Sequence, residues 1–143
     1  MHPTRSPRRG GNAVEFALLM PVFLVLVFGT VDYGWVMYHL AALHSAAHHG
    51  CRRATLIDPG PGETNLQSVV DTAELAMLER FEDDGPGCPS GGCSTEVQVT
   101  GAVPERSIVC RLALPIEPIV GYVSVPVSLQ ATAVMRLEYQ RGG

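Results

Sequence analysis

Residues 16–38 read FALLMPVFLVLVFGTVDYGWVMY, a run of 23 residues with a single charged side chain, that of Asp32. At about 1.5 Å per residue, a helix of this length spans the ~30 Å hydrocarbon core of a bilayer. Pro21 lies inside the run, and membrane helices tolerate such a proline as a kink. The run therefore predicts a single transmembrane helix.

The charges that flank the run predict its orientation. Three arginines precede it, and the first arginine after it is Arg52. Because cytoplasmic flanks of membrane helices carry an excess of Lys and Arg, we expect a cytoplasmic N-terminus and an extracytoplasmic C-terminal domain in the cell membrane. The three N-terminal arginines are Arg5, Arg8 and Arg9, and the aromatic residues expected at the outer interface are Tyr33, Trp35 and Tyr38.

A cleavable secretory signal is the competing interpretation of this run. Its apolar region usually measures ~7–15 residues, which is shorter than the run observed here. Small residues between Ala41 and Ala47 nevertheless resemble a signal-peptidase site. The two alternatives differ in whether the apolar helix remains in the mature chain.

The chain beyond the run has the length and charge of one small acidic domain. Of its 143 residues, about a hundred follow the run, which is enough for one domain. Seven arginines and twelve acidic residues lie there, a net charge of about −5, and the chain has no lysine. Such a surface repels phosphate backbones, which argues against nucleic acid as a partner.

Two helical segments are predicted after the membrane span. Residues 39–56 are rich in alanine, so the helix is expected to continue as a stalk. A Pro/Gly turn at residues 58–63 separates it from a second helix, which starts with a capping box of Thr64 and Gln67 and ends near residue 82. The apolar face of this second helix is predicted to hold Leu66, Val70, Ala73, Met77 and Phe81.

Three segments alternate between apolar and polar residues as β-strands do, namely residues 95–103, 107–114 and 129–138. The first two are expected to pair as a hairpin. The predicted fold class is thus α+β, with a single N-terminal transmembrane helix extended as a stalk, one amphipathic helix and a roughly three-stranded antiparallel sheet. The predicted division is a basic leader (1–10), the helix and stalk (11–56) and an extracytoplasmic domain (57–143).

The boundary before the apolar run resembles a prepilin signal. Residues 8–23 read RRGGNAVEFALLMPVF, and the resemblance is to prepilins of the Flp pilus system. In that family a prepilin peptidase cuts after a Gly, and a Glu followed by an aromatic residue stands five residues into the mature chain. A cut between Gly10 and Gly11 places Glu15 and Phe16 at those positions, although the adjacent glycines leave the cut site ambiguous by one residue.

Within this system the chain is most similar to the TadE-like minor pseudopilins. The similarity covers residues 9–54 and rests on VEFALLMPVF, FGTVDYG and AAHHGCRRAT. It implies a non-catalytic protein that associates with the lipid bilayer, a prepilin peptidase and other pilins and pseudopilins. It also implies that the α-amino group created by cleavage pairs with Glu15 of an adjacent subunit.

Asp32 is the one acid inside the apolar run. Near the outer end of the helix its carboxylate can reach water, which avoids most of the cost of burial. Two roles are open for it, an interfacial acid that reaches the headgroups or a contact with the helix of a neighbouring subunit.

The four cysteines follow the apolar run, where an oxidising compartment favours disulfides. Cys88 and Cys93 flank the short segment PSGG and are expected to pair with each other. A bond between Cys51 and Cys110 would tie the stalk to the sheet and stabilise the fold more, because it closes a longer loop. Zinc binding is the alternative, but the C-x4-C spacing is looser than that of common zinc sites.

A histidine cluster is the other candidate metal site. His44 and His48 stand four residues apart on one helix face, with His39 and His49 close by. No acid completes a familiar motif, so these histidines are expected to be solvated or to contact a neighbouring helix. The chain has no phosphate loop, no nucleophile elbow and no HExxH motif, so no catalytic site, resident metal or cofactor is expected. The acids Glu82, Asp83 and Asp84 are interpreted as a solvated helix end.

Three hypotheses about function follow. The first is a TadE-like minor pseudopilin, an assembly component of a Flp (Tad) type IV pilus or related secretion filament. The second is an independent, membrane-anchored extracytoplasmic binding module, which the absence of neighbouring genes for a pilus ATPase and platform protein would favour. The third, a metal-dependent enzyme that uses the histidines, requires bound metal in the purified protein.

Overall fold

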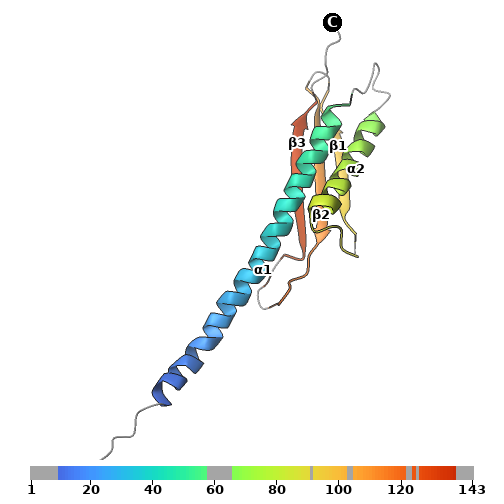
Figure 1. Cartoon of the computed structure of the whole chain (residues 1–143). Helices are drawn as coiled ribbons and strands as arrows, with labels where there is room; N and C mark the ends of the chain where they lie inside the picture. Colours follow the sequence, from blue (N-terminus) through green and yellow to red (C-terminus); the bar gives the residue numbers. More distant parts are fainter. Residues whose placement is uncertain are drawn as a thin grey trace, which may run out of the picture.

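A computed structural model of the chain describes residues 10–57, 66–90, 92–102, 105–121, 124 and 126–137. These residues form two helices and a three-stranded antiparallel sheet, so the predicted α+β class is confirmed. The N-terminal arginines, the turn at residues 58–63, Thr64 and Glu138 lie outside the described residues. The elements are α1 (Gly10–Thr55), α2 (Leu66–Asp84), β1 (Ser94–Thr100), β2 (Ser107–Pro115) and β3 (Ser128–Arg136), as Figure 1 shows.

Helix α1 is one continuous helix of 46 residues that passes through Pro21. At 1.5 Å per residue it is about 69 Å long, more than twice the thickness of a hydrocarbon core. Its last turn carries Arg52 and Arg53, whose charges are favourable at a helix C-terminus. The N-terminal half extends away from the rest of the molecule, whereas the C-terminal half lies along the sheet and α2 (Figure 1).

The C-terminal half of α1 is part of the domain core. The predicted stalk, residues 39–56, packs along the sheet and α2, because small side chains on one face of the helix permit close packing. That face recurs every three or four residues, which is the spacing of a single helical stripe. The buried residues of this stripe are Asp32, Val36, His39, Leu43, Ala46, Ala47, Gly50, Cys51 and Ala54.

Gly50 sets the distance between α1 and α2. A Cβ atom at this position would lie 2.7 Å from the carbonyl oxygen of Ala73 and would also overlap the side chain of Met77. Ala73 and Met77 are themselves fully buried. The two helices therefore cross at a contact between a glycine and the backbone of the opposite helix, which leaves no room for a side chain.

Helix α2 agrees with the predicted amphipathic helix in position and, for most residues, in its buried face. The structure buries Ala73, Met77 and Phe81, as the sequence predicts. It buries Val69 instead of Val70, and Val70 is only partly buried. In this turn the buried side chain therefore lies one position earlier than expected, Leu66 is only partly buried, and Ala76 is buried in addition.

The sheet is a meander in the order β1-β2-β3 with the predicted hairpin between its first two strands. Val97 is opposite Cys110, and Cys110 is opposite Ala133, so these three residues lie in one row across the sheet. The predicted alternation of β2 and β3 is confirmed, because every second side chain faces the helices. The fully or largely buried strand residues are Ile108, Cys110, Leu112, Leu114, Leu129, Ala131 and Ala133.

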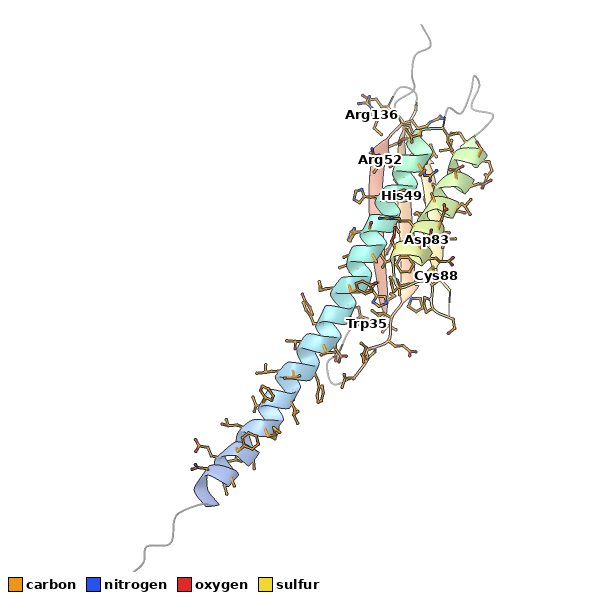
Figure 2. All side chains as sticks on the ribbon, in the orientation of Figure 1. Trp35, His49, Arg52, Asp83, Cys88 and Arg136 are labelled. Atoms are coloured by element: carbon orange, nitrogen blue, oxygen red, sulfur yellow. A yellow bond between two sulfur atoms is a disulfide. The ribbon has the colours of Figure 1, made fainter. Side chains whose placement is uncertain are left out.

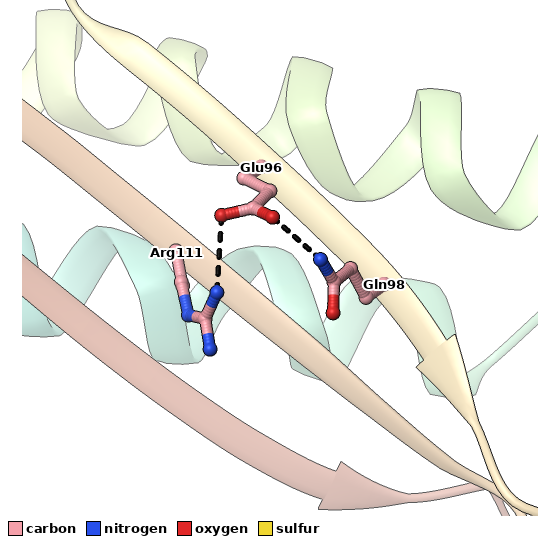
Figure 3. A network of polar contacts seen from close by, with 3 residues as sticks. All are labelled: Glu96, Gln98 and Arg111. Carbon is pink, nitrogen blue, oxygen red and sulfur yellow. Dashed lines mark hydrogen bonds and ion pairs between the residues drawn. The ribbon is translucent and has the colours of Figure 1, made fainter.

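The other face of the sheet is not covered by a helix and carries polar side chains. Arg111 and Glu96 occupy opposite positions on β2 and β1, and their charged groups lie 3.1 Å apart. The side-chain amide of Gln98 donates a hydrogen bond to the same carboxylate, as Figure 3 shows. Both charged side chains are more than a third exposed, so this cross-strand ion pair contributes at most about 1 kcal/mol.

Candidate functional site

The first candidate site is the exposed apolar segment of α1, defined here as residues 11–31. Four consecutive large apolar residues, from Leu24 to Val27, are each at least 38% exposed, so the segment is apolar on every face. Among the described residues this is the one helix long and apolar enough to cross a membrane, and its most apolar window is not buried against the domain. Figure 2 shows its side chains pointing outward in all directions.

The predicted processing and assembly residues lie at the start of this segment. Helix α1 begins at Gly10, and a Cβ atom at Gly11 would meet no neighbouring atom. Glu15 is exposed in the second turn, and the adjacent Phe16 is 63% exposed. Both side chains are therefore accessible to a membrane partner.

Asp32 marks the point where the exposed apolar segment ends and the domain begins. Its side chain is fully buried, and Oδ1 accepts a hydrogen bond of 2.9 Å from the backbone N–H of Val120. Its other oxygen, Oδ2, is buried without a hydrogen-bond partner. A contact of Asp32 with a neighbouring subunit stays a prediction, and in this structure the carboxylate binds a loop of its own chain.

The sequence offered only an indirect signal for this contact. An acid inside an apolar run requires a partner, but Val120 lies 88 positions away and contributes a backbone N–H, which carries no side-chain pattern. The segment that contains Val120 connects β2 to β3 and is itself apolar. From the sequence, the contact is therefore indicated only by an acid inside an apolar run and by the apolar character of the segment between β2 and β3.

Aromatic side chains surround the helix just beyond Asp32. Trp35 is 36% exposed, and Tyr38 is 50% exposed. His39 is buried, its Nδ1 lies 2.9 Å from the carbonyl oxygen of Trp35, and the two rings meet edge to face. Exposed Trp and Tyr residues at the end of an apolar segment are typical of a membrane–water interface.

All four cysteines of the chain form disulfides. Cys88 pairs with Cys93 as predicted, with a Cα–Cα distance of 5.5 Å. Cys51 pairs with Cys110 at 5.9 Å and connects α1 to the central strand β2. Disulfides persist in oxidising compartments, so both bonds are consistent with an extracytoplasmic domain. With both pairs oxidised, the sulfur atoms are not available as zinc thiolates.

The histidines do not assemble into a metal site in the described part of the chain. His44 and His48 are exposed, His49 is partly buried, and His39 faces the domain. No group of three or more His, Cys, Asp or Glu residues with metal-binding geometry occurs among the described residues. At the acidic end of α2, the side chain of Asp84 pairs with Arg80 one turn before it.

The fold and these sites define an α+β domain, held together by two disulfides, that continues from a single exposed apolar helix of the kind that anchors proteins in membranes. Residues 10–52 match the family model described as TadE-like protein, so this segment of the chain is similar to that family. No curated protein and no solved structure matches the chain.

Proposed function

We propose that the chain is a TadE-like minor pseudopilin, a non-enzymatic assembly component of a Flp (Tad) type IV pilus or related secretion filament. The observation that carries this proposal is that the family match and helix α1 begin at the same residue, directly before the exposed apolar segment. The family match begins at Gly10, helix α1 begins at the same residue, and the apolar segment that follows is exposed on every face up to Val27. A helix of this kind is suited to contacts with lipid and with other helices.

Processing is expected at the start of α1. A prepilin peptidase would cut between Gly10 and Gly11, or one residue later. The cut removes the three N-terminal arginines and leaves the exposed apolar segment complete. The open space around Gly11 supports this assignment, because no described part of the chain encloses the site.

Glu15 and Phe16 are the proposed assembly residues. Cleavage creates a new α-amino group about one helical turn before Glu15, and a carboxylate in an apolar environment is strongly stabilised by pairing with a cation. The pair forms between the ammonium of one subunit and Glu15 of the next. Phe16 and the apolar side chains beyond it pack against the helices of neighbouring pilins.

The proposed location is the cell membrane, with a cytoplasmic N-terminus and an extracytoplasmic domain. The arginines before α1 support this orientation, because the positive-inside rule retains them in the cytoplasm. The two disulfides support it independently, because they require an oxidising compartment.

The core argues against a signal-peptidase cut near residues 41–47. Ala46 and Ala47 are fully buried, so cleavage there would have to open the packed core. It would also detach Val36 from the core cluster that it shares with α2 and the sheet. The folded domain therefore depends on the same helix that carries the apolar segment.

The mass of the membrane-extracted chain tests the proposal. We expect a mature chain that begins at Gly11 or Asn12 in a host with an active prepilin peptidase. Changing Gly10 and Gly11 together to leucine should block the cut. A chain that begins at Met1 in such a host would contradict the pseudopilin role and favour the independent binding module.

Assembly is tested separately from cleavage. Glu15→Ala should be processed normally but enter filament fractions poorly, because it removes the partner of the new ammonium group. Glu82→Ala is the matched control, since it removes an exposed carboxylate at the far end of α2. Equal incorporation of the two variants would refute the role of Glu15.

A further inference from the structure

We propose that the described part of the β2–β3 loop, residues 116–121, 124, 126 and 127, is a second membrane contact of this protein, whose apolar side chains insert into the bilayer interface beside α1. This inference requires that α1 lies in a bilayer. It does not depend on a pilus role, because any protein anchored by this helix would place the loop in the same position.

The first step is the position of the loop along α1. The N–H of Val120 lies 2.9 Å from Oδ1 of Asp32, and Asp32 directly follows Val31, the last residue of the exposed apolar segment. Figure 1 shows the coloured trace that follows β2 leaving the sheet toward the N-terminal half of α1. The loop therefore contacts α1 at the end of its exposed apolar segment.

The second step is the depth of that level. Residues 11–31 would form about 31 Å of helix, which matches a ~30 Å hydrocarbon core. The exposed Tyr38, which is suited to the headgroup region, stands six residues beyond Asp32, or about 9 Å further along the helix. The contact between Asp32 and Val120 thus lies on the bilayer side of Tyr38. A span of residues 16–38 would place it deeper still.

The loop is held in this position at two points. At its base the N–H of Ile116 donates a hydrogen bond of 3.0 Å to the carbonyl oxygen of Val127, which closes the loop. Near Asp32 the chain turns at Gly121, whose φ of +76° is a conformation that favours glycine. A loop fixed at both points loses little conformational entropy when it binds a surface.

The chemistry of the loop selects an apolar partner. Ile119 is 57% exposed and Val127 is 84% exposed, so both present apolar surface outward. Glu117 is the one charged residue in the sequence between Arg111 and Arg136. Without a lysine or arginine the loop has no means of attracting anionic headgroups, so its contact rests on burial of apolar side chains.

Continuity with α1 identifies this partner as lipid. The exposed apolar surface of the loop adjoins the exposed apolar segment of the helix through the hydrogen bond of Asp32. A bilayer that surrounds residues 11–31 therefore reaches Ile119 without any further protein. The loop then restrains the domain from tilting, because the molecule touches the membrane at two places.

Tryptophan fluorescence of the full chain in vesicles tests the proposal. Trp35 is the single tryptophan, so Trp35→Phe combined with Ile119→Trp gives a chain with one reporter in the loop. In zwitterionic phosphatidylcholine vesicles that contain brominated lipids, this reporter should lose emission about as strongly as Trp35 does in the native chain. The quenching should not change with salt or with added anionic lipid.

Two further variants control the measurement. Trp35→Phe with Leu75→Trp places the reporter on α2, at a side chain that is 68% exposed, and should be quenched by aqueous acrylamide but not by brominated lipid. Val127→Trp is a second loop reporter for the case that position 119 does not tolerate the larger ring.

The outcomes separate lipid from other partners. A loop reporter that behaves like the one at position 75 overturns the proposal. Emission that depends on the protein-to-lipid ratio, without lipid quenching, would assign the loop to a contact between copies and also overturn it. Strong quenching by brominated lipid at position 119 or 127, with Trp35 quenched in the native chain, supports it.

Discussion

The two halves of α1 belong to one helix but face two different environments. Residues 11–31 carry large apolar side chains on every face, and none of the most apolar window is buried by the domain. Residues 32–55 bury one stripe, most of which consists of small residues such as Ala46 and Gly50. A helix that is covered by lipid carries large apolar side chains on all sides. A helix that packs closely against a sheet and a second helix needs small side chains on one face.

The largest effect is expected from the covalent link that fixes the second half to the sheet. Replacing Cys51 and Cys110 together with alanine should lower the free energy of unfolding by about 4 kcal/mol, because their bond closes a loop of 59 residues. The same change at Cys88 and Cys93 should cost only about 2 kcal/mol, since they are five residues apart. Urea unfolding of the full chain in detergent measures both, and equal losses would contradict the dependence on loop length.

A charge placed in each half should separate their environments. Phe23→Arg puts a cation near the centre of the exposed apolar segment and should disfavour membrane insertion by about 3 kcal/mol. His44→Arg, on the exposed side of the second half, should leave insertion unchanged. Carbonate extraction of membranes reports the inserted fraction. A similar loss of membrane insertion for both variants would show that the two halves of α1 do not differ in environment.

Two glycines of α1 provide a finer comparison. Gly50→Ala should destabilise the domain by about 1–3 kcal/mol, because the new methyl group meets the carbonyl oxygen of Ala73 and the side chain of Met77. Gly34→Ala should leave stability unchanged or raise it by up to about 1 kcal/mol, because its Cβ meets nothing and alanine favours helix. Thermal unfolding in detergent measures both. A stabilising Gly50→Ala variant would contradict the close crossing of α1 and α2.

The smallest effect is expected at the boundary between the halves. Asp32→Ala leaves the N–H of Val120 without its acceptor and should cost about 1 kcal/mol. Asp32→Asn retains an acceptor oxygen and should cost less. Amide hydrogen exchange at Val120 is the direct measurement, and protection that is unchanged in the alanine variant would remove Asp32 from this role.

Much of the fold could be predicted because its signals are local. The apolar run, the helical stripe through Ala73, Met77 and Phe81, and the alternation in β2 and β3 each lie within one segment. The pairing of Cys88 with Cys93 is equally local, since only PSGG lies between them. Each of these patterns requires no knowledge of what lies elsewhere in the chain.

The remaining features depend on distant partners. The alanine-rich residues 39–56 predict a stalk, but small residues suit a solvated helix and a tightly packed helix equally well. Only the position of Met77 and Ala73 opposite Gly50 decides between them. Likewise, the hydrogen-bond partner of Asp32 could not be predicted. The partner is a backbone N–H 88 positions away, and no side-chain pattern marks a backbone group.

The bond between Cys51 and Cys110 also determines how the molecule bears tension. A pull applied between the membrane-embedded end of α1 and the end of β3 passes directly from one cysteine to the other. The residues between these two cysteines, which are 59 positions apart and enclose α2 and β1, lie off this covalent path and carry no load. At roughly 3.4 Å per extended residue, the disulfide thereby prevents about 200 Å of chain from extending under force. The domain consequently behaves under tension as a short, stiff connector. Reduction of the bond between Cys51 and Cys110 would allow the chain between them to extend.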